Sequence, residues 1–252
     1  SYFKNRGGML IMKAIKIIAR QTLASYRKPS SLKIKESYPL PPYSTVIGMV
    51  HAACGFEEYV DMDISIQGNY YTRLNEMYTK YEFKPGFYDP KGRHSLKVPH
   101  KDMEKDTGIV QGPANIELLS EVKLLLHICP NDQNKIDYIY QKLKNPEEYL
   151  SLGRREDLLV MENVDKIDII QEELKQDYEL KQDAYIPEGY LKAGDCKSQA
   201  TIYKLNKKYT VNPKTGVRFW EKQIYATHVS KGSVIQEGAQ VITDGEEIIF
   251  LA

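Results

Sequence analysis

The 252-residue sequence predicts an α+β fold: a ferredoxin-like, RRM-like N-terminal domain over residues 12–172 and a small antiparallel β-rich region over 173–252. The first observation is the order strand, helix, strand, strand, helix, strand, which is the order of the split βαβ unit. The second is the segment 74–115, which is too long for an ordinary connection. The third is an alternation of polar and apolar residues after Tyr185, which is typical of antiparallel strands.

The first strand is expected at Lys13–Thr22, where polar and apolar residues alternate before a short apolar run. Residues 1–11 show no clear pattern and are left out of the fold prediction.

A helix is predicted after the proline-rich stretch 36–42. The prolines at 39, 41 and 42 remove backbone donors and favour an extended chain. Ser44 or Thr45 is expected to cap the helix, and Gly55 to end it. The apolar residues of the helix recur on one face: Val46, Met49, Val50 and Ala53. The free N–H groups at the start of such a helix can bind phosphate.

The remaining N-terminal elements are predicted from the spacing of their apolar and polar residues. They are strands at Ile64–Arg73 and Val122–Ile128, a helix at Gln133–Leu143, and a glycine turn that enters a fourth strand within Leu152–Val160. In the C-terminal region, Ala200–Val211 and Val217–His228 form a predicted hairpin, and Ala239–Thr243 pairs with Glu247–Leu251 across an Asp-Gly turn.

The long segment 74–115 interleaves cations with aromatic residues. The basic residues between positions 80 and 101 are Lys80, Lys84, Lys91, Arg93, Lys97 and Lys101, whereas the acids are Glu82 and Asp89, and His94 and His100 add further donors. Cations can hold an RNA backbone while rings stack on its bases. The alternative is a solvated hairpin with ordinary surface lysines.

A glycine-arginine turn is the second candidate for anion binding. Gly153 lets backbone N–H groups approach a phosphate, and Arg154 and Arg155 can each bind it with two hydrogen bonds. Glu156 can hold one of these arginines in position. The alternative is a structural turn with a surface salt bridge.

Composition limits the other function classes. The net charge is +1, from 35 basic and 34 acidic residues, so a nucleic-acid surface requires local segregation of charge. Cys54, Cys129 and Cys196 have no metal-ligand spacing, so no metal and no cofactor are expected, and a reducing cytoplasm fits best. No apolar run is long enough to cross a membrane.

Five stretches together resemble the fifth family of CRISPR-associated proteins, and within it the type I-B branch: Tyr26–Pro29, Ser37–Gly55, Lys84–Asp89, Gly112–Leu119 and Leu152–Leu158. The resemblance implies an RRM-like domain with a β-hairpin thumb, here residues 74–115. Its members sit at the foot of the Cascade surveillance complex and cap the 5′ handle of the CRISPR RNA (crRNA). The implied partners are this handle, the family-seven backbone subunit and the family-eight large subunit. Target DNA near the protospacer-adjacent motif is a further candidate.

The resemblance and the charge pattern together predict one set of RNA-binding residues, with the thumb at the handle–spacer junction. The set is Arg20, Tyr26, Arg27, Lys28, Tyr43, Ser44, Thr45, Arg73, Lys84, Arg93, His94, Lys97, Gly153, Arg154 and Arg155.

Two other functions are considered. The type I-C branch of the family cuts the crRNA precursor without a metal, and such cleavage needs an acid, a base and a cation. Candidates for those roles are Tyr43, His51, His94 and His100, with Lys97 or Lys101. His51 is expected to pack or cap within its helix, and His127 and His228 to be structural. The type I-B resemblance implies binding without catalysis. The third function is a protein-bridging subunit whose basic thumb meets an acidic partner.

Overall fold

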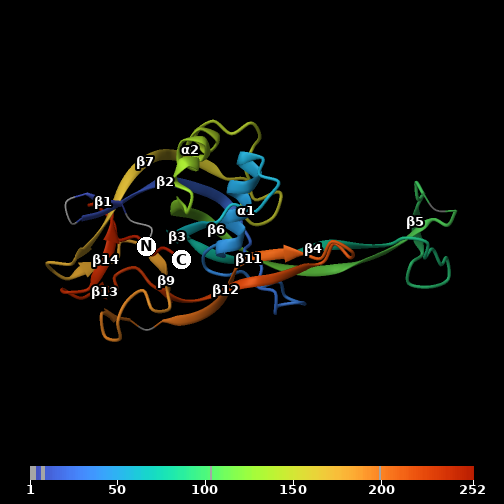
Figure 1. The fold of residues 1–252 in the computed structure, drawn as a ribbon. Coiled ribbons are helices and arrows are strands. Elements are labelled where there is room, and N and C mark those ends of the chain that lie inside the picture. Colours follow the sequence, from blue (N-terminus) through green and yellow to red (C-terminus); the bar gives the residue numbers. More distant parts are fainter. Residues whose placement is uncertain (1–3, 7–8, 103, 199) are drawn as a thin grey trace.

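The computed structural model describes residues 4–6, 9–102, 104–198 and 200–252. A large antiparallel sheet carries two α-helices, and a long hairpin extends from one side of it (Figure 1). None of the described helices has the length and apolar character that a membrane span requires.

In the described part of the chain, the large sheet has eleven strands. They are β1 (Lys4–Arg6), β2 (Met9–Ala24), β3 (Met62–Asn69), β4 (Thr72–Lys84), β5 (Leu96–Val98), β6 (Thr107–Pro130), β7 (Val160–Glu173), β9 (Asp183–Pro187), β11 (Thr201–Val211), β12 (Arg218–Val229) and β14 (Gln240–Thr243). A three-stranded sheet contains β8 (Tyr178–Glu179), β10 (Cys196–Lys197) and β13 (Val234–Ile235). The helices are α1 (Tyr43–Cys54), the short 3-10 helix η1 (Gln133–Lys135) and α2 (Ile136–Lys144).

The centre of the large sheet is formed by the strands in the order β3-β6-β2-β7, and every neighbouring pair is antiparallel. The chain passes from β2 to β3 through α1 and from β6 to β7 through α2. Both helices pack on the same face, over buried residues such as Ile15, Ile17 and Leu126. The first strand begins earlier than predicted, at Met9, and β1 pairs with it, so residues left out of the prediction contribute to the sheet.

Helix α1 confirms the predicted buried face and the predicted end, but not the predicted cap. Pro42 occupies the N-cap position in an extended conformation, and its carbonyl accepts hydrogen bonds from the amides of Thr45 and Val46 at 2.9 and 3.3 Å. Ser44 and Thr45 therefore lie inside the first turn. Gly55 ends the helix with a φ of 64°, the left-handed conformation that glycine adopts without strain.

Three more predicted strands have different boundaries in the structure. The strand predicted at Val122–Ile128 is the C-terminal part of β6, which begins at Thr107. The strand expected at 64–73 is two strands, because the chain turns after Asn69, and Arg73 therefore belongs to β4. The fourth strand begins at Val160, because the residues before it form an irregular loop closed by a bridge between Ser151 and Leu158. The helix predicted at 133–143 is confirmed as η1 followed by α2.

The C-terminal strands extend both edges of the large sheet, so the division at residue 172 stays a prediction. The β11–β12 hairpin is confirmed, with Val211 paired to Arg218. The second predicted hairpin is only partly formed: β14 pairs with β7, and a single bridge links Thr243 to Ile248.

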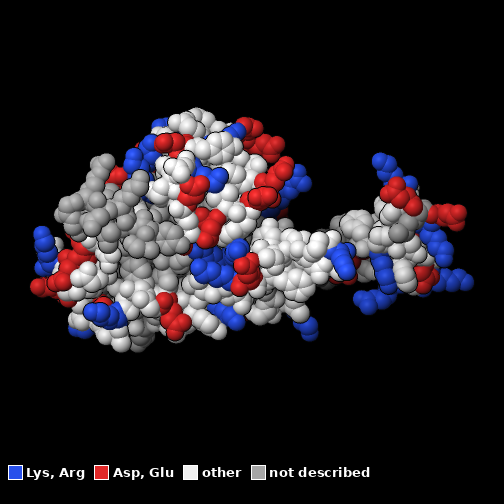
Figure 2. Space-filling model, viewed as in Figure 1, with Lys and Arg blue, Asp and Glu red and all other residues white. Residues whose placement is uncertain are grey.

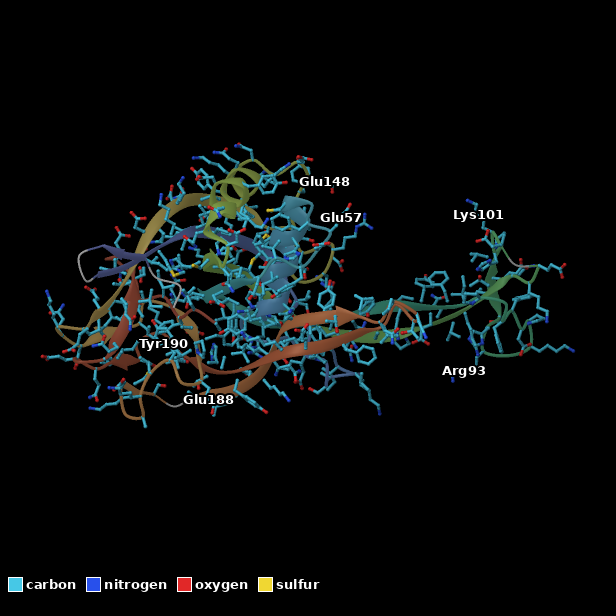
Figure 3. The ribbon with its side chains drawn as sticks, viewed as in Figure 1. Glu57, Arg93, Lys101, Glu148, Glu188 and Tyr190 are labelled. Carbon is cyan, nitrogen blue, oxygen red and sulfur yellow. The ribbon has the colours of Figure 1, made fainter. Side chains whose placement is uncertain are left out.

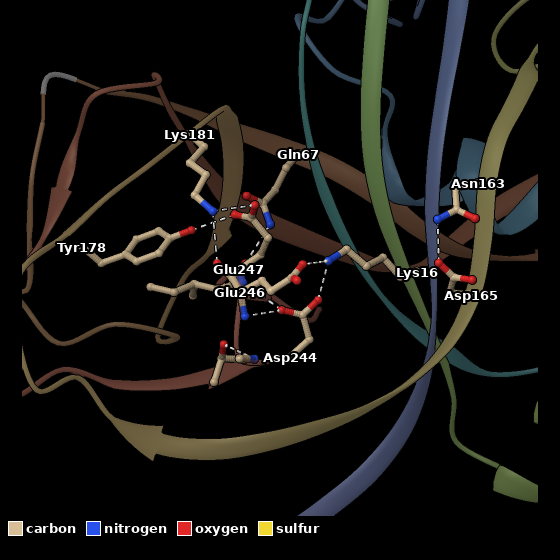
Figure 4. A network of polar contacts seen from close by, with 12 residues as sticks. Lys16, Gln67, Asn163, Asp165, Tyr178, Lys181, Asp244, Glu246 and Glu247 are labelled. Carbon is tan, nitrogen blue, oxygen red and sulfur yellow. Dashed lines mark hydrogen bonds and ion pairs between the residues drawn. The ribbon is translucent and has the colours of Figure 1, made fainter.

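Residues 244–252, which we call the covering segment, leave that hairpin and lie on the sheet face opposite the helices. The Gln67 side chain donates to the Ile248 carbonyl at 2.7 Å, and the Phe250 amide donates to the Ser65 hydroxyl at 3.0 Å. Lys16 binds Asp244 at 2.6 Å at the other end of this segment (Figure 4). The centre of this face of the sheet is therefore occupied by the protein's own chain.

Candidate nucleic-acid interface

The long hairpin comprises residues 72–120, from β4, β5 and the first part of β6. Its base, where it joins the sheet, faces the loop 27–36. Alternate residues of a strand share one face, so Glu76, Tyr78, Lys80 and Glu82 lie together on the same side of β4. Hydrogen bonds hold the loop against the hairpin, since the Glu117 amide donates to the Lys35 carbonyl at 3.3 Å.

Two hollows lie between the loop and the hairpin. The first, which we call the cationic hollow, has a volume of about 400 Å³, and its charged lining residues are Lys33, Lys35, Lys80, Arg93 and Glu82. The second, which we call the Tyr78 hollow, has a volume of about 370 Å³ and is lined by Ser25, Arg27, Lys35, Glu76, Tyr78, Ile116, Arg154 and Glu156. Lys35 lines both hollows, so they adjoin.

Lys35 is held at this junction by an unusual backbone and a ring contact. Its φ is 55°, in the left-handed region that is uncommon for a residue with a side chain. Its ammonium group lies 4.4 Å from the centroid of the Tyr78 ring. Desolvation lowers the pKa of Lys35, and the positive charges of Arg27, Lys80 and Arg154 lower it further. Like charges gathered in this way are typical of a site that binds an anion.

Arg154 is fixed by a buried carboxylate that the sequence prediction missed. Asp157, of which the side chain is 1% exposed, accepts from the Nη2 and Nε atoms of Arg154 at 2.6 and 3.0 Å. Its Oδ2 atom also accepts from the amides of Ser25 and Arg154, both at 2.9 Å. Glu156 contacts Nη1 at 3.0 Å, as the sequence suggested.

Gly153 allows close packing in the turn at residues 152–157, which we call the corner. Its φ is 110°, and a Cβ atom there would lie 2.9 Å from both Asp157 Oδ2 and the Ser25 carbonyl. The corner is closed from behind by Gln21, whose amide donates to the carbonyls of Leu152 and Asp157. Gly153 therefore acts through close packing of the corner.

Two of the predicted RNA contacts, Tyr26 and Tyr43, need correction, and a third residue, Arg155, lies apart from Arg154. Tyr26 and Tyr43 are 2% and 0% exposed, because both rings pack in the main core. Their side chains are not available to a ligand in this structure. Arg155 does not share a site with Arg154, because it lines a separate hollow of about 830 Å³ beside the C-terminal end of α1, with Met49 and Tyr149.

The outer end of the hairpin presents further cations (Figure 2). Lys84 lies 3.5 Å from the centroid of the Phe87 ring, and Lys97 binds Asp106 at 2.5 Å. The ring of His94 lies 6.4 Å from that of Phe87. Arg93 and Lys101 project on different sides of this end (Figure 3), so cations face more than one direction there.

The other predicted residues lie at separate places. Arg20 is on β2 and binds Glu162 at 3.0 Å, and Arg73 is engaged by Tyr70 and Glu117 at the hairpin base. Lys28 binds Glu36 at 3.3 Å. Ser44 and Thr45 are half-buried in the first turn of α1 and make no capping hydrogen bond there. From the predicted set, the structure thus brings Arg27 and Arg154 together in the Tyr78 hollow and places Arg93 in the adjoining cationic hollow, but it does not gather the whole set.

The histidines considered for catalysis are spread over different elements. Both backbone groups of Val60 lie 3.3 Å from the Nε2 atom of His51, and desolvation lowers the pKa of this imidazole. The Nδ1 atom of His100 accepts from the Asp102 amide at 3.1 Å. Burial raises the pKa of the Tyr43 hydroxyl well above its usual range. His51 therefore has the packing role that the sequence suggested.

Sequence reasoning missed Lys35 and Asp157 as members of this site, and it named Lys80 only among the basic residues of the segment 74–115. The Lys-Ile-Lys run at 33–35 was the available signal for the loop, because its lysines alternate with an apolar residue. Asp157 gave no such signal, because two acids that follow two arginines are typical of a charged surface turn.

Comparison with known proteins places the chain in a family. No curated protein matches it. Similar solved structures include a "CRISPR RNA-guided surveillance complex", with 16% identity, a TM-score of 0.46, and coverage of 89% of this chain and 91% of that one. A CRISPR protein from Archaeoglobus fulgidus has 12% identity, a TM-score of 0.47 and coverage of 96% and 99%. The family model described as "CRISPR-associated protein (Cas_Cas5)" matches residues 15–199, which is more than half of the chain. The protein therefore belongs to the Cas5 family of CRISPR-associated proteins.

Proposed function

We propose that this protein is the non-catalytic subunit of a type I-B Cascade complex that binds and caps the 5′ handle of crRNA. In this proposal residues 12–172 form an RRM-like domain, and the long hairpin is its thumb. Family membership supports the assignment to CRISPR defence. The sequence resemblance supports the type I-B branch, a cytoplasmic location, and the family-seven and family-eight subunits as neighbours.

The observation that carries the proposal is the group of cations between the loop 27–36 and the hairpin base. Desolvation lowers the pKa of Lys35 most, and the positive charges of Arg27, Lys80 and Arg154 lower it further. A phosphate backbone beside these cations would relieve their repulsion. The net charge of the whole chain is only +1, so this local grouping is the segregation that RNA binding requires.

The position of the covering segment also supports RNA binding at the base of the hairpin. RRM domains stack bases on aromatic residues of the open sheet face. Here the corresponding face carries Ser65, Gln67 and His127, which are buried beneath residues 244–252. RNA is therefore assigned to the hairpin base, and the outer cations, such as Lys84 and Lys97, are assigned to the handle–spacer junction.

The proposal is tested by the salt dependence of RNA binding. Labelled repeat RNA is titrated with the wild-type protein and with Lys35→Gln and Lys80→Gln at several salt concentrations. Each substitution is expected to weaken binding and to reduce the slope of log K against log salt by about 0.7, the value for one contact to single-stranded RNA.

Lys175→Gln is the matched control, because Lys175 is an exposed lysine in the connection after β7, away from the hairpin. It removes the same charge and is expected to leave the slope unchanged. Equal effects of all three substitutions would show that only net charge matters, and would reject the hairpin base as the RNA site.

A further inference from the structure

We propose that the Tyr78 hollow is a base-specific subsite that takes one guanine extruded from the bound RNA. This inference rests on the proposed function, because it assigns a ligand to part of the same interface. The hollow has a volume of about 370 Å³, within the range of small-ligand pockets. The side chains of Tyr78 and Ile116 supply apolar walls, and polar groups of both signs complete the lining.

Two of those polar groups are available to a ligand. Among the described residues, the Glu76 carboxylate has no hydrogen bond or ion pair, and only an electrostatic contact with Arg154. The Arg27 side chain likewise has no hydrogen-bond partner in the described part of the chain. Arg154 and Glu156, in contrast, are already bound to each other, and Arg154 is also held by Asp157.

A free carboxylate and a free guanidinium in one hollow select among the four bases. A carboxylate only accepts hydrogen bonds, whereas a guanidinium only donates them. Guanine offers two adjacent donors, N1–H and the N2 amino group, to a carboxylate. It also offers two adjacent acceptors, O6 and N7, to an arginine. Adenine and cytosine each present one amino group, and the single N–H of uracil lies between two carbonyl oxygens, which a carboxylate repels. Guanine is therefore the base whose edges match both Glu76 and Arg27.

The adjoining cationic hollow explains how a nucleotide would be held. Lys35 lines both hollows, and its ammonium group lies on the Tyr78 ring. A phosphate beside Lys35 and Lys80 would thus place the nucleobase of the same nucleotide, or of the next nucleotide, at the mouth of the Tyr78 hollow. The loop 27–36 and the foot of the hairpin would hold the RNA backbone and the nucleobase from opposite sides.

The test uses an oligouridylate of about eight nucleotides as the parent RNA, with one guanosine moved along it. At one position, guanosine is expected to raise affinity about 10-fold over uridine, adenosine or cytidine, the effect of one good paired contact. Inosine, which lacks only the N2 amino group, is expected to lose most of this gain. In Glu76→Gln, guanosine and inosine should bind equally, and the affinity for the all-uridine RNA should not fall.

Glu82→Gln is the matched control, since Glu82 is on the same face of β4 but lines the cationic hollow and pairs with Lys80. It should strengthen binding to all the RNAs alike and keep the guanosine preference. RNA binding with the expected salt slope but no guanosine preference would overturn the subsite and leave the proposed function standing. The subsite is also overturned if Glu76→Gln keeps the preference. A failure of the wild type to bind any of these RNAs would reject both proposals.

Discussion

Asp157→Asn is expected to destabilise the protein and weaken RNA binding at the same time. Asp157 is almost fully buried and accepts hydrogen bonds from the amides of Ser25 and Arg154 and from the Arg154 guanidinium. Asparagine keeps the shape but removes the charge, and its amide nitrogen must face at least one of these donors. Leaving these buried donors without an acceptor costs about 1–3 kcal/mol. That is a large part of the 5–15 kcal/mol by which typical proteins are stable.

The measurement is the free energy of unfolding in urea, with RNA affinity measured on the folded variant. Glu156→Gln is the control, because Glu156 binds the same guanidinium but its side chain is 64% exposed. An exposed pair of this kind contributes about 1 kcal/mol or less. Arg154 also lines the Tyr78 hollow, so freeing it from Asp157 should reduce RNA affinity as well.

If Asp157→Asn loses no more stability than Glu156→Gln, the buried carboxylate does not hold Arg154 and the two backbone amides as described. That result would mean that the corner is held by Gly153 and by the Gln21 hydrogen bonds, and not by the carboxylate.

Two further predictions concern the histidines. Burial lowers the pKa of His127 to about 3, so on acidification the unfolded state takes up a proton on this imidazole before the folded state does. The free energy of unfolding should therefore fall as the pH drops below about 6.5, by about 2 kcal/mol between pH 7 and 5 from this group. His127→Leu should show a shallower pH dependence of unfolding. With repeat RNA in EDTA, the wild-type protein is expected to give no specific cleavage product; a product that disappears in His94→Ala or His100→Ala would instead establish the metal-free endoribonuclease.

The sequence was informative where local chemistry decides the structure. The prolines at 39–42 and Gly55 limit α1, and the turn at 212–216 fixes the β11–β12 hairpin. Periodicity identified the buried face of α1 and the position of α2, because core packing imposes that spacing.

The sequence was less informative where distant segments meet. Pairing of β14 with β7, and the path of the covering segment along β3, depend on contacts between residues far apart in the chain. The adjacent arginines of the glycine turn point into different hollows, and only the three-dimensional path of the corner decides this. Tyr26 and Tyr43 were predicted to bind RNA because basic or hydroxyl residues are adjacent to them in the sequence, although their rings are buried in the core.

Strand β6 has a mechanical consequence for the molecule. It runs without interruption from the hairpin, where it pairs with β4, to the middle of the sheet, where it pairs with β2 and β3. Glu121, with a φ of 48°, marks the one position of positive φ along this strand among the described residues. A lateral load on the projecting hairpin is therefore transmitted along a single continuous strand into the hydrogen-bonded centre of the sheet. A neighbour that grips the hairpin would in this way also fix the orientation of the whole body.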